Sequence, residues 1–293
     1  MSELRQGFVR VGGIQLHHTH GGSGSPPLLF IHGIGSSGYI EWRHNLDHFA
    51  RSHHVFAPDL PGFGRSAKPR NVRYGIPFFA RTIARYLEGR RIRRAIVVGT
   101  SMGGRVAIEL AQRWPEKIER LVLVNALGFG LPRIQPYYPA LLLPRVGEAL
   151  VRSVGVGLKV APRGLIRRVA ARFTGGTAVA AAMSDQYLDD MREMYASEGY
   201  PEAYSRTMRS LADPLALIVS GMADQSGKLA ELGKPILLIW GDGDPLFPVE
   251  LATRAHARMP GSRLVLIAGA GHTPQAERPD EFNRALANFI RTR

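Results

Sequence analysis

The sequence predicts an α/β fold built on a mostly parallel, eight-stranded sheet with flanking helices and an inserted helical segment. Three observations predict it. Short apolar runs alternate with helical patterns in the first 126 residues, the alternation resumes after residue 232, and the stretch between shows helical patterns without strands. Alternation at this pace is typical of parallel strands joined by crossover helices.

The first strands are expected near the amino terminus. Residues 8–11 and 14–20 are separated by Gly12-Gly13, which suits a tight hairpin turn. Residues 27–31 contain the continuous apolar run Leu-Leu-Phe-Ile, which is typical of a strand buried on both faces. Similar short apolar segments predict strands at residues 54–57, 95–98 and 121–124.

Helices are expected between these strands, at residues 41–50, 78–87 and 102–114. The third is the clearest, because Val106, Leu110 and Trp114 recur at four-residue intervals and Pro115 stops the pattern.

The domain organisation expected is a core in two parts, residues 1–126 and 233–293, with residues 127–232 as a helical insertion between them. Prolines punctuate the start of the insert, and helical patterns follow at residues 141–158, 165–173 and 185–197. The second part of the core supplies strands at residues 236–240 and 264–267 and helices at residues 249–258 and 280–291.

The insert divides into two halves of opposite charge. Residues 127–175 carry eight Lys or Arg against one acid, Glu148, whereas residues 176–232 carry four against nine acids. Opposite charges attract, so the two halves are expected to face each other.

Composition excludes several classes of protein. The 293 residues contain no cysteine, which excludes a disulfide framework, thiolate metal sites, iron–sulfur clusters and a cysteine nucleophile. The net charge of +14 is spread along the chain without an RNA-binding signature or zinc-finger spacing, so no nucleic-acid partner is expected. Without an apolar run of about 18 residues or a signal peptide, a cytoplasmic protein with no membrane insertion is expected, and a homodimer is left open.

The segment Gly99-Thr100-Ser101-Met102-Gly103 is a G-x-S-x-G motif between an expected strand and an expected helix. At such a turn the serine adopts a strained backbone that projects its hydroxyl from the sheet, and the residues two positions away must be small. Ser101 is therefore a candidate nucleophile.

A serine hydroxyl needs a base to take its proton, and a carboxylate to orient that base. Of the ten histidines, His272 lies in a loop between the last expected strand and the last helix, where a parallel sheet displays catalytic groups. The carboxylate should also follow a strand, and Asp242 and Asp244 both follow residues 236–240. Asn125, after residues 121–124, is neutral and would serve poorly.

The chain resembles the α/β-hydrolase superfamily in five blocks that occur in the family's order. They are His32-Gly33-Ile34-Gly35, Asp59-Leu60-Pro61-Gly62-Phe63-Gly64-Arg65-Ser66, Gly99-Thr100-Ser101-Met102-Gly103-Gly104, Gly241-Asp242-Gly243-Asp244 and Gly271-His272. The resemblance implies the α/β-hydrolase fold and selects Asp244 as the triad acid, leaving Asp242, His32 and Asp59 as loop-shaping residues. It also implies an oxyanion hole formed by the backbone N–H groups of Ile34 and Met102.

The resemblance implies a reaction without metal or organic cofactor. A serine nucleophile argues against the aspartate-dependent dehalogenases and epoxide hydrolases, and favours a carboxylesterase acting on small-molecule esters. The similar meta-cleavage hydrolases, which split carbon–carbon bonds, usually carry asparagine before the serine and tryptophan after the histidine. This chain has Thr100 and Thr273.

Three alternatives stay open: carbon–carbon hydrolase, lactonase, and a small-molecule receptor that keeps the hydrolase fold. The resemblance also implies that residues 127–232 form a helical cap or lid over Ser101. Five residues of this insert are expected either to line an acyl pocket or to pack the cap helices: Met183, Met191, Met194, Tyr187 and Tyr195.

Overall fold

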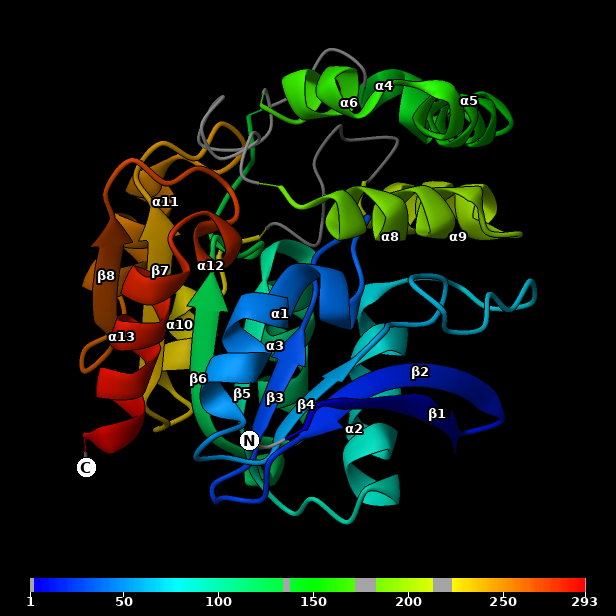
Figure 1. Ribbon diagram of the computed structural model, residues 1–293. Helices are drawn as coiled ribbons and strands as arrows, with labels where there is room; N and C mark the ends of the chain where they lie inside the picture. The colour runs from blue at the N-terminus through cyan, green and yellow to red at the C-terminus, as the bar shows by residue number, and fades with distance from the viewer. Residues whose placement is uncertain (1–2, 134–137, 172–182, 213–222, 293) are drawn as a thin grey trace.

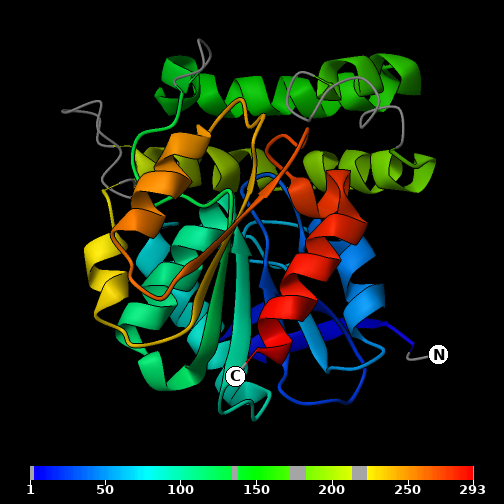
Figure 2. The same ribbon diagram turned by 90° about the vertical axis from the view of Figure 1, so that its left-hand side faces the viewer.

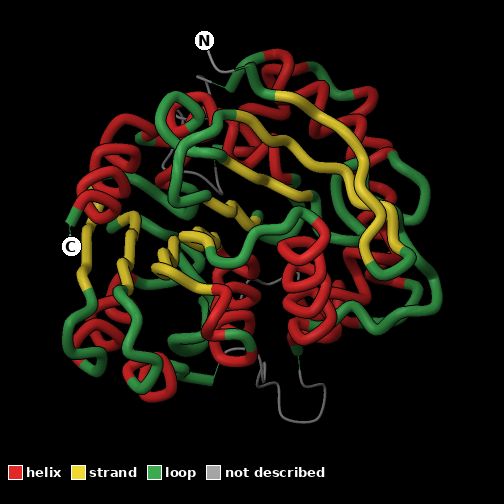
Figure 3. The backbone as a smooth tube through the Cα atoms, turned by 90° about the horizontal axis from the view of Figure 1, so that it is seen from below, coloured by secondary structure: helices red, strands yellow, loops and turns green. Residues whose placement is uncertain are grey.

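The computed structural model describes residues 3–133, 138–171, 183–212 and 223–292. Its centre is an eight-stranded sheet in the order β1-β2-β4-β3-β5-β6-β7-β8, in which β1 and β2 run antiparallel to their neighbours and β3 to β8 run parallel. The strands follow one another in a twisted row that is flanked by helices (Figure 3). This confirms the predicted sheet. The strands are β1 (Arg5–Val11), β2 (Ile14–Gly21), β3 (Leu28–Ile31), β4 (Val55–Pro58), β5 (Ala95–Thr100), β6 (Ile118–Val124), β7 (Ile236–Gly241) and β8 (Arg263–Ile267).

Helices cover both faces of this sheet. Helices α2 (Ile76–Gly89), α3 (Ser101–Arg113), α10 (Ser226–Ala230) and α11 (Val249–Ala257) contribute to the core on one face. The core on the other face includes α1 (Gly38–Phe49) and α13 (Pro279–Arg291), the latter following the short helix α12 (Pro274–Glu277).

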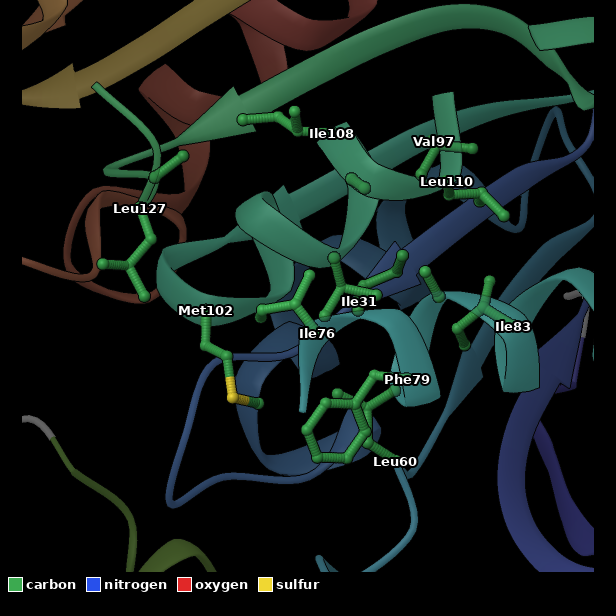
Figure 4. Packing of buried hydrophobic residues seen from close by; sticks show 14 of the residues in the cluster. Ile31, Leu60, Ile76, Phe79, Ile83, Val97, Met102, Ile108, Leu110 and Leu127 are labelled. Carbon is green, nitrogen blue, oxygen red and sulfur yellow. The ribbon is translucent and has the colours of Figure 1, made fainter. Parts of the chain in front are cut away.

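Alternate residues of the central strands face these two cores. In β5, Val97 belongs to one core and Ile96 and Val98 belong to the other, and all three are fully buried. Burial on both faces explains why the parallel strands are continuous apolar runs. Figure 4 shows the first core, where Met102 and Leu127 lie at the end nearest the loops that follow the strands.

Helices α4 to α9, which follow β6, form two tiers beyond the carboxyl ends of the parallel strands (Figures 1 and 2). The outer tier holds α4 (Tyr138–Leu142), α5 (Val146–Val160) and α6 (Arg163–Ala170), and the inner tier, nearer the sheet, holds α8 (Asp185–Ala196) and α9 (Tyr200–Leu211). Described residues of this segment contain no strand, as expected.

Helix boundaries in this segment differ from the prediction. The helix expected over residues 141–158 is two helices, broken at Leu143–Arg145, because Pro144 has no N–H to donate and Arg145 adopts a positive φ of 69°. The helix expected over residues 165–173 is described only as far as Ala170, and residues 172–173 lie outside the described ranges. Helices α9 and α10 were not predicted, since Pro201 near the start of α9 and the short length of α10 weaken their patterns.

Ion pairs join the two tiers, as the opposite charges of the two halves predict. Arg152 reaches Glu202 at 2.6 Å, and Arg163 reaches Asp189 at 2.7 Å. The one acid of the basic half, Glu148, pairs with Arg209 at 2.5 Å. Cations of the outer tier thus lie against acids of the inner tier.

Candidate active site

The candidate residues lie at one edge of the sheet. Strands β3, β5, β6, β7 and β8 are parallel, so the loops after them emerge at a common carboxyl edge. These loops carry His32, Ser101, Asn125, Asp244 and His272. The topology therefore gathers segments that are up to 240 residues apart in the chain.

Ser101 occupies a strained turn between β5 and α3. Its φ is +51°, in the left-handed region that non-glycine residues rarely adopt, and its side chain is largely buried. The turn is tight because a Cβ on Gly99 would lie 2.4 Å from Gly103 O, and one on Gly103 would lie 2.3 Å from Ile31 O. Both positions therefore require glycine, as the motif predicts.

Replacing Gly103 by alanine should destabilise the protein severely. The new Cβ would collide with backbone of β3, which cannot move without breaking the sheet, so we expect a loss of about 3 kcal/mol or more and a Tm drop of roughly 6–10 °C in thermal denaturation. Gly164→Ala in α6 is the matched control, because a Cβ there has no neighbour within 4 Å and should cost nothing. Equal melting temperatures for the two variants would contradict the packing described.

Asp244 and His272 form a hydrogen-bonded pair. His272 Nδ1 lies 2.9 Å from Asp244 Oδ2, and Asp244 Oδ1 accepts the backbone N–H groups of Leu246 at 2.7 Å and Phe247 at 3.0 Å. The Asp244 side chain is fully buried and that of His272 is 13% exposed. Because Asp244 engages Nδ1, the Nε2 of His272 remains for another partner.

Asn125 completes the support of Asp244. Its Nδ2 donates to Asp244 Oδ2 at 2.5 Å, and its Oδ1 accepts from the backbone N–H of Gly241 at 3.2 Å. Asn125 also has a positive φ of 40° and no exposed surface. The sequence analysis set Asn125 aside because it is neutral, and missed that its amide can hold the carboxylate of Asp244 in place.

Contact between the two side chains lowers the pKa of Asp244 and raises the pKa of His272, as suits a carboxylate that supports a base. Burial by itself raises the pKa of Asp244, but the charge and hydrogen bond of His272, with the Asn125 amide, outweigh it and lower the pKa below its usual range. Burial lowers the pKa of His272, but Asp244, Glu41 and Glu277 outweigh it, so the pKa of His272 is raised above 6.5. Asp244 therefore stays ionised beside the imidazole.

The loop that carries His272 is held from both sides. Glu277 accepts the backbone N–H groups of Gly271 at 2.7 Å and Thr273 at 2.9 Å, and also the Thr273 hydroxyl at 2.9 Å. Asp242 accepts the N–H of Gly269 at 2.8 Å. Asp242 is thus a loop-bracing residue, as expected, and Glu277 is a second brace that the sequence did not reveal.

His32 and Asp59 shape loops, in agreement with the sequence. His32 Nε2 accepts the N–H of Leu60 at 2.9 Å, so its proton is on Nδ1, which donates to Gly33 O at 2.7 Å. Burial lowers the pKa of His32, which keeps it neutral. Asp59 accepts hydrogen bonds from the backbone N–H groups of Gly38 and Arg65 and from the His17 ring, so both of its carboxylate oxygens are engaged.

The loop after β3 lies against the serine turn. A Cβ on Gly33, the residue before Ile34, would be 3.2 Å from Ser101 Cβ. Met102 stands in the first turn of α3, where N–H groups lack partners within the helix. On its other side this loop meets the inner tier, since a Cβ on Gly35 would be 3.3 Å from Tyr195 Oη and from Tyr204 Cε2.

Glu41 is a carboxylate beside the serine turn that the sequence reasoning missed. It stands in the first turn of α1, where Gln275 Nε2 donates to its Oε1 at 2.7 Å, and its Oε2 would lie 3.7 Å from a Cβ on Gly33. Gln275 is fully buried and also approaches Thr100 Oγ1 at 3.5 Å. Gln275, just after His272, thus contacts both Glu41 and Thr100, the residue before Ser101.

Replacing Glu41 by glutamine should shift the pH dependence of activity. Glu41 raises the pKa of His272, so its neutral replacement lowers that pKa, and the acid limb of kcat/KM, expected above pH 6.5 in the wild type, moves to lower pH. The measurement is a pH–rate profile on a neutral ester. The control is Glu116→Gln, because Glu116 lies in the 3-10 turn Pro115–Lys117, beyond the end of α3 that is distant from Ser101. An acid limb that stays in place would show that Glu41 does not act on His272.

Among the described residues, no group of three or more histidine or acidic side chains has an arrangement suited to a metal ion. The side chains gathered at this edge include a hydroxyl, an imidazole and carboxylates.

Comparison with known proteins gives concordant results. The family described as alpha/beta hydrolase fold matches residues 26–279. The dihydrolipoyllysine-residue acetyltransferase component of the acetoin cleaving system of Cupriavidus necator is 32% identical over 284 residues, covering 97% of this chain and 68% of that protein. The 2-hydroxy-6-oxo-2,4-heptadienoate hydrolase of Pseudomonas putida is 25% identical over 291 residues, covering 97% and 95%. The solved 2-hydroxy-6-oxo-6-phenylhexa-2,4-dienoate hydrolase of Rhodococcus sp. strain RHA1 superposes with a TM-score of 0.78 at 19% identity, covering 100% of both chains.

Proposed function

Because the chain belongs to the α/β-hydrolase family, we propose that it hydrolyses carboxylic esters of small molecules through an acyl-enzyme, with Ser101, His272 and Asp244 as its triad. The observation that carries the proposal is the bond between Asp244 and His272 Nδ1, at the same sheet edge as the strained Ser101. A histidine held through Nδ1 by an ionised carboxylate is the general base that a serine nucleophile requires.

The residues act in a fixed sequence in this proposal. Ser101 Oγ attacks the ester carbonyl while His272 Nε2 takes its proton, and the imidazolium is stabilised by Asp244. His272 then gives the proton to the leaving alkoxide, and a water activated by the same imidazole cleaves the acyl-enzyme. The backbone N–H groups of Ile34 and Met102 would stabilise the oxyanion, each of them contributing about 10²–10³ in rate.

Residues 127–232 serve as the cap over this site, inserted between core segments 1–126 and 233–293. Support comes from Tyr195 and Tyr204, which approach Gly35 in the loop proposed to hold the oxyanion. Tyr195 and Tyr187 belong to α8, so this helix would bound the acyl side of the site. Met194, by contrast, is buried in the core, which supports packing as its role.

Ester hydrolysis is favoured over carbon–carbon cleavage by the two residues beside the triad. Thr100 and Thr273 stand where meta-cleavage hydrolases usually carry asparagine and tryptophan, and the Thr273 hydroxyl is already bound to Glu277. Neither threonine offers a side-chain amide or indole N–H to a substrate. Carbon–carbon hydrolysis is the second candidate, because the Pseudomonas putida relative is named as a hydrolase of 2-hydroxy-6-oxo-2,4-heptadienoate, a compound of the meta-cleavage type.

A substrate panel tests the proposal. We expect p-nitrophenyl esters of graded acyl length to be cleaved with the highest kcat/KM, a lactone more slowly, and a vinylogous diketone of the meta-cleavage type least. A higher kcat/KM for the diketone would reverse the assignment between the two hydrolases. Tight binding of a panel member without turnover would instead identify a receptor.

A further inference from the structure

Exposed apolar side chains gather on the outer tier of the insert. Eleven large hydrophobic residues are exposed in the described chain, and eight of them lie between residues 143 and 169. We call these eight the outer face: Leu143, Val146, Leu150, Val154, Val156, Val160, Leu165 and Val169. Scattered single exposures are ordinary, but contiguous ones mark an interaction surface.

The direction of α5 explains why this face is outside. Its buried positions, Gly147, Val151 and Gly155, recur every four residues, and a Cβ on Gly155 would lie 2.8 Å from Tyr195 O, so α5 rests closely on α8. At 3.6 residues per turn, Val146, Val156 and Val160 lie on the side of α5 opposite that contact, and Leu150 and Val154 lie on its exposed flank. A helix of a monomeric soluble protein normally presents polar residues on its outward side, whereas α5 presents exposed valines on that side.

Positive charge accompanies the outer face. Arg163 and Arg167 are paired with acids of the inner tier, but within the part of the chain that the structure describes no acidic side chain pairs with Lys159 or Arg168, which are both exposed. Glu148, the one acid of residues 127–175, is taken by Arg209. The outer face thus combines apolar side chains with free cations.

We propose that the outer face docks on the surface of an anionic phospholipid bilayer, with Leu150, Val154 and Val160 at the boundary between headgroups and acyl chains and Lys159 and Arg168 at the headgroups. Apolar side chains beside free cations match such a surface, which offers both a hydrocarbon boundary and negative charge. A second copy of this chain is a poor occupant, because it carries the same net charge of +14.

The contact would be peripheral. None of the helices in the described ranges is long and apolar enough to cross a membrane. The proposal concerns a binding surface and is independent of the hydrolase reaction.

Co-sedimentation of the full chain with vesicles tests the proposal. We expect binding to mixed phosphatidylcholine–phosphatidylglycerol vesicles and at least about tenfold weaker partitioning to phosphatidylcholine alone, because each free cation adds attraction to an anionic surface. Raising the salt from about 0.01 M to about 0.15 M should weaken binding, since the screening length falls from about 30 Å to about 8 Å. Failure to bind the anionic vesicles would overturn the proposal.

Two pairs of substitutions locate the contact. Leu150→Asp with Val154→Asp should reduce partitioning by about tenfold or more, because charged groups resist burial at the acyl boundary. The control, Phe8→Asp with Leu266→Asp, replaces two comparably exposed side chains on β1 and β8 and should bind as the wild type does. Both variants should keep the wild-type circular dichroism and turnover of a short water-soluble ester.

Other outcomes decide against the proposal. Equal loss in both double variants would show that binding does not use the outer face. A concentration-dependent dimer that only the Leu150→Asp, Val154→Asp variant abolishes, with no vesicle binding, would assign this face to self-association.

Discussion

Ser101→Ala should lower kcat on an activated ester by about 10⁴–10⁶-fold, because the variant retains the fold and the backbone donors but has no atom to form the acyl-enzyme. The substitution removes one oxygen from a nearly buried side chain and leaves the Gly99 and Gly103 contacts untouched. Alanine keeps the Cβ and the positive φ of this turn, so thermal stability should stay close to that of the wild type. Initial rates with p-nitrophenyl esters, at equal concentrations of circular-dichroism-verified protein, provide the measurement.

Ser36→Ala is the matched control for this experiment. Ser36 belongs to the loop after β3 at the same edge of the sheet and is buried to the same degree as Ser101, but no part of the proposed chemistry passes through its hydroxyl. Its turnover should remain within a few-fold of the wild type. Full turnover by Ser101→Ala would show that another group is the nucleophile.

Asp244→Asn should lower kcat by about 10⁴-fold, since the amide no longer holds His272 in the tautomer that leaves Nε2 free to accept a proton. The structure adds a second reason. Asp244 Oδ1 accepts two backbone N–H groups, so in the variant the amide oxygen would take that place and the NH₂ would face the NH₂ of Asn125, where two donors meet without an acceptor.

The residual activity of Asp244→Asn should also change its pH dependence. Asp244 raises the pKa of His272, so removing its charge lowers that pKa and moves the acid limb to lower pH. Asp242→Asn, two residues earlier, is the control, because that carboxylate braces Gly269 and does not contact His272. Comparable losses in the two variants would contradict the assignment of Asp244.

The parts of the fold that the sequence predicts are those with strong local patterns. Leu28–Ile31 and Ile236–Gly241 are buried on both faces, and two-sided burial leaves a continuous apolar run that is visible without coordinates. Ser101 can be proposed as the nucleophile from the sequence because its turn demands Gly99 and Gly103 at fixed spacing.

The supporting residues could not be predicted in the same way. Asn125 and Asp244 are 119 residues apart and meet only because β6 and β7 are neighbours in the sheet. Glu41 and Gln275 are separated by 234 residues and join α1 to α12. Neither pair is marked by a local motif, because each residue is needed only for a hydrogen bond to a partner that is distant in the sequence and is brought near by the fold.

The central claim is that Ser101 is the group made nucleophilic at this edge of the sheet, and covalent labelling tests it most directly. After reaction with a fluorophosphonate, which phosphonylates activated serines, mass spectrometry of the digested protein should find one adduct, on the peptide containing Ser101, and none in Ser101→Ala. An adduct on a different residue, or equal labelling of Ser101→Ala and the wild type, would contradict the account.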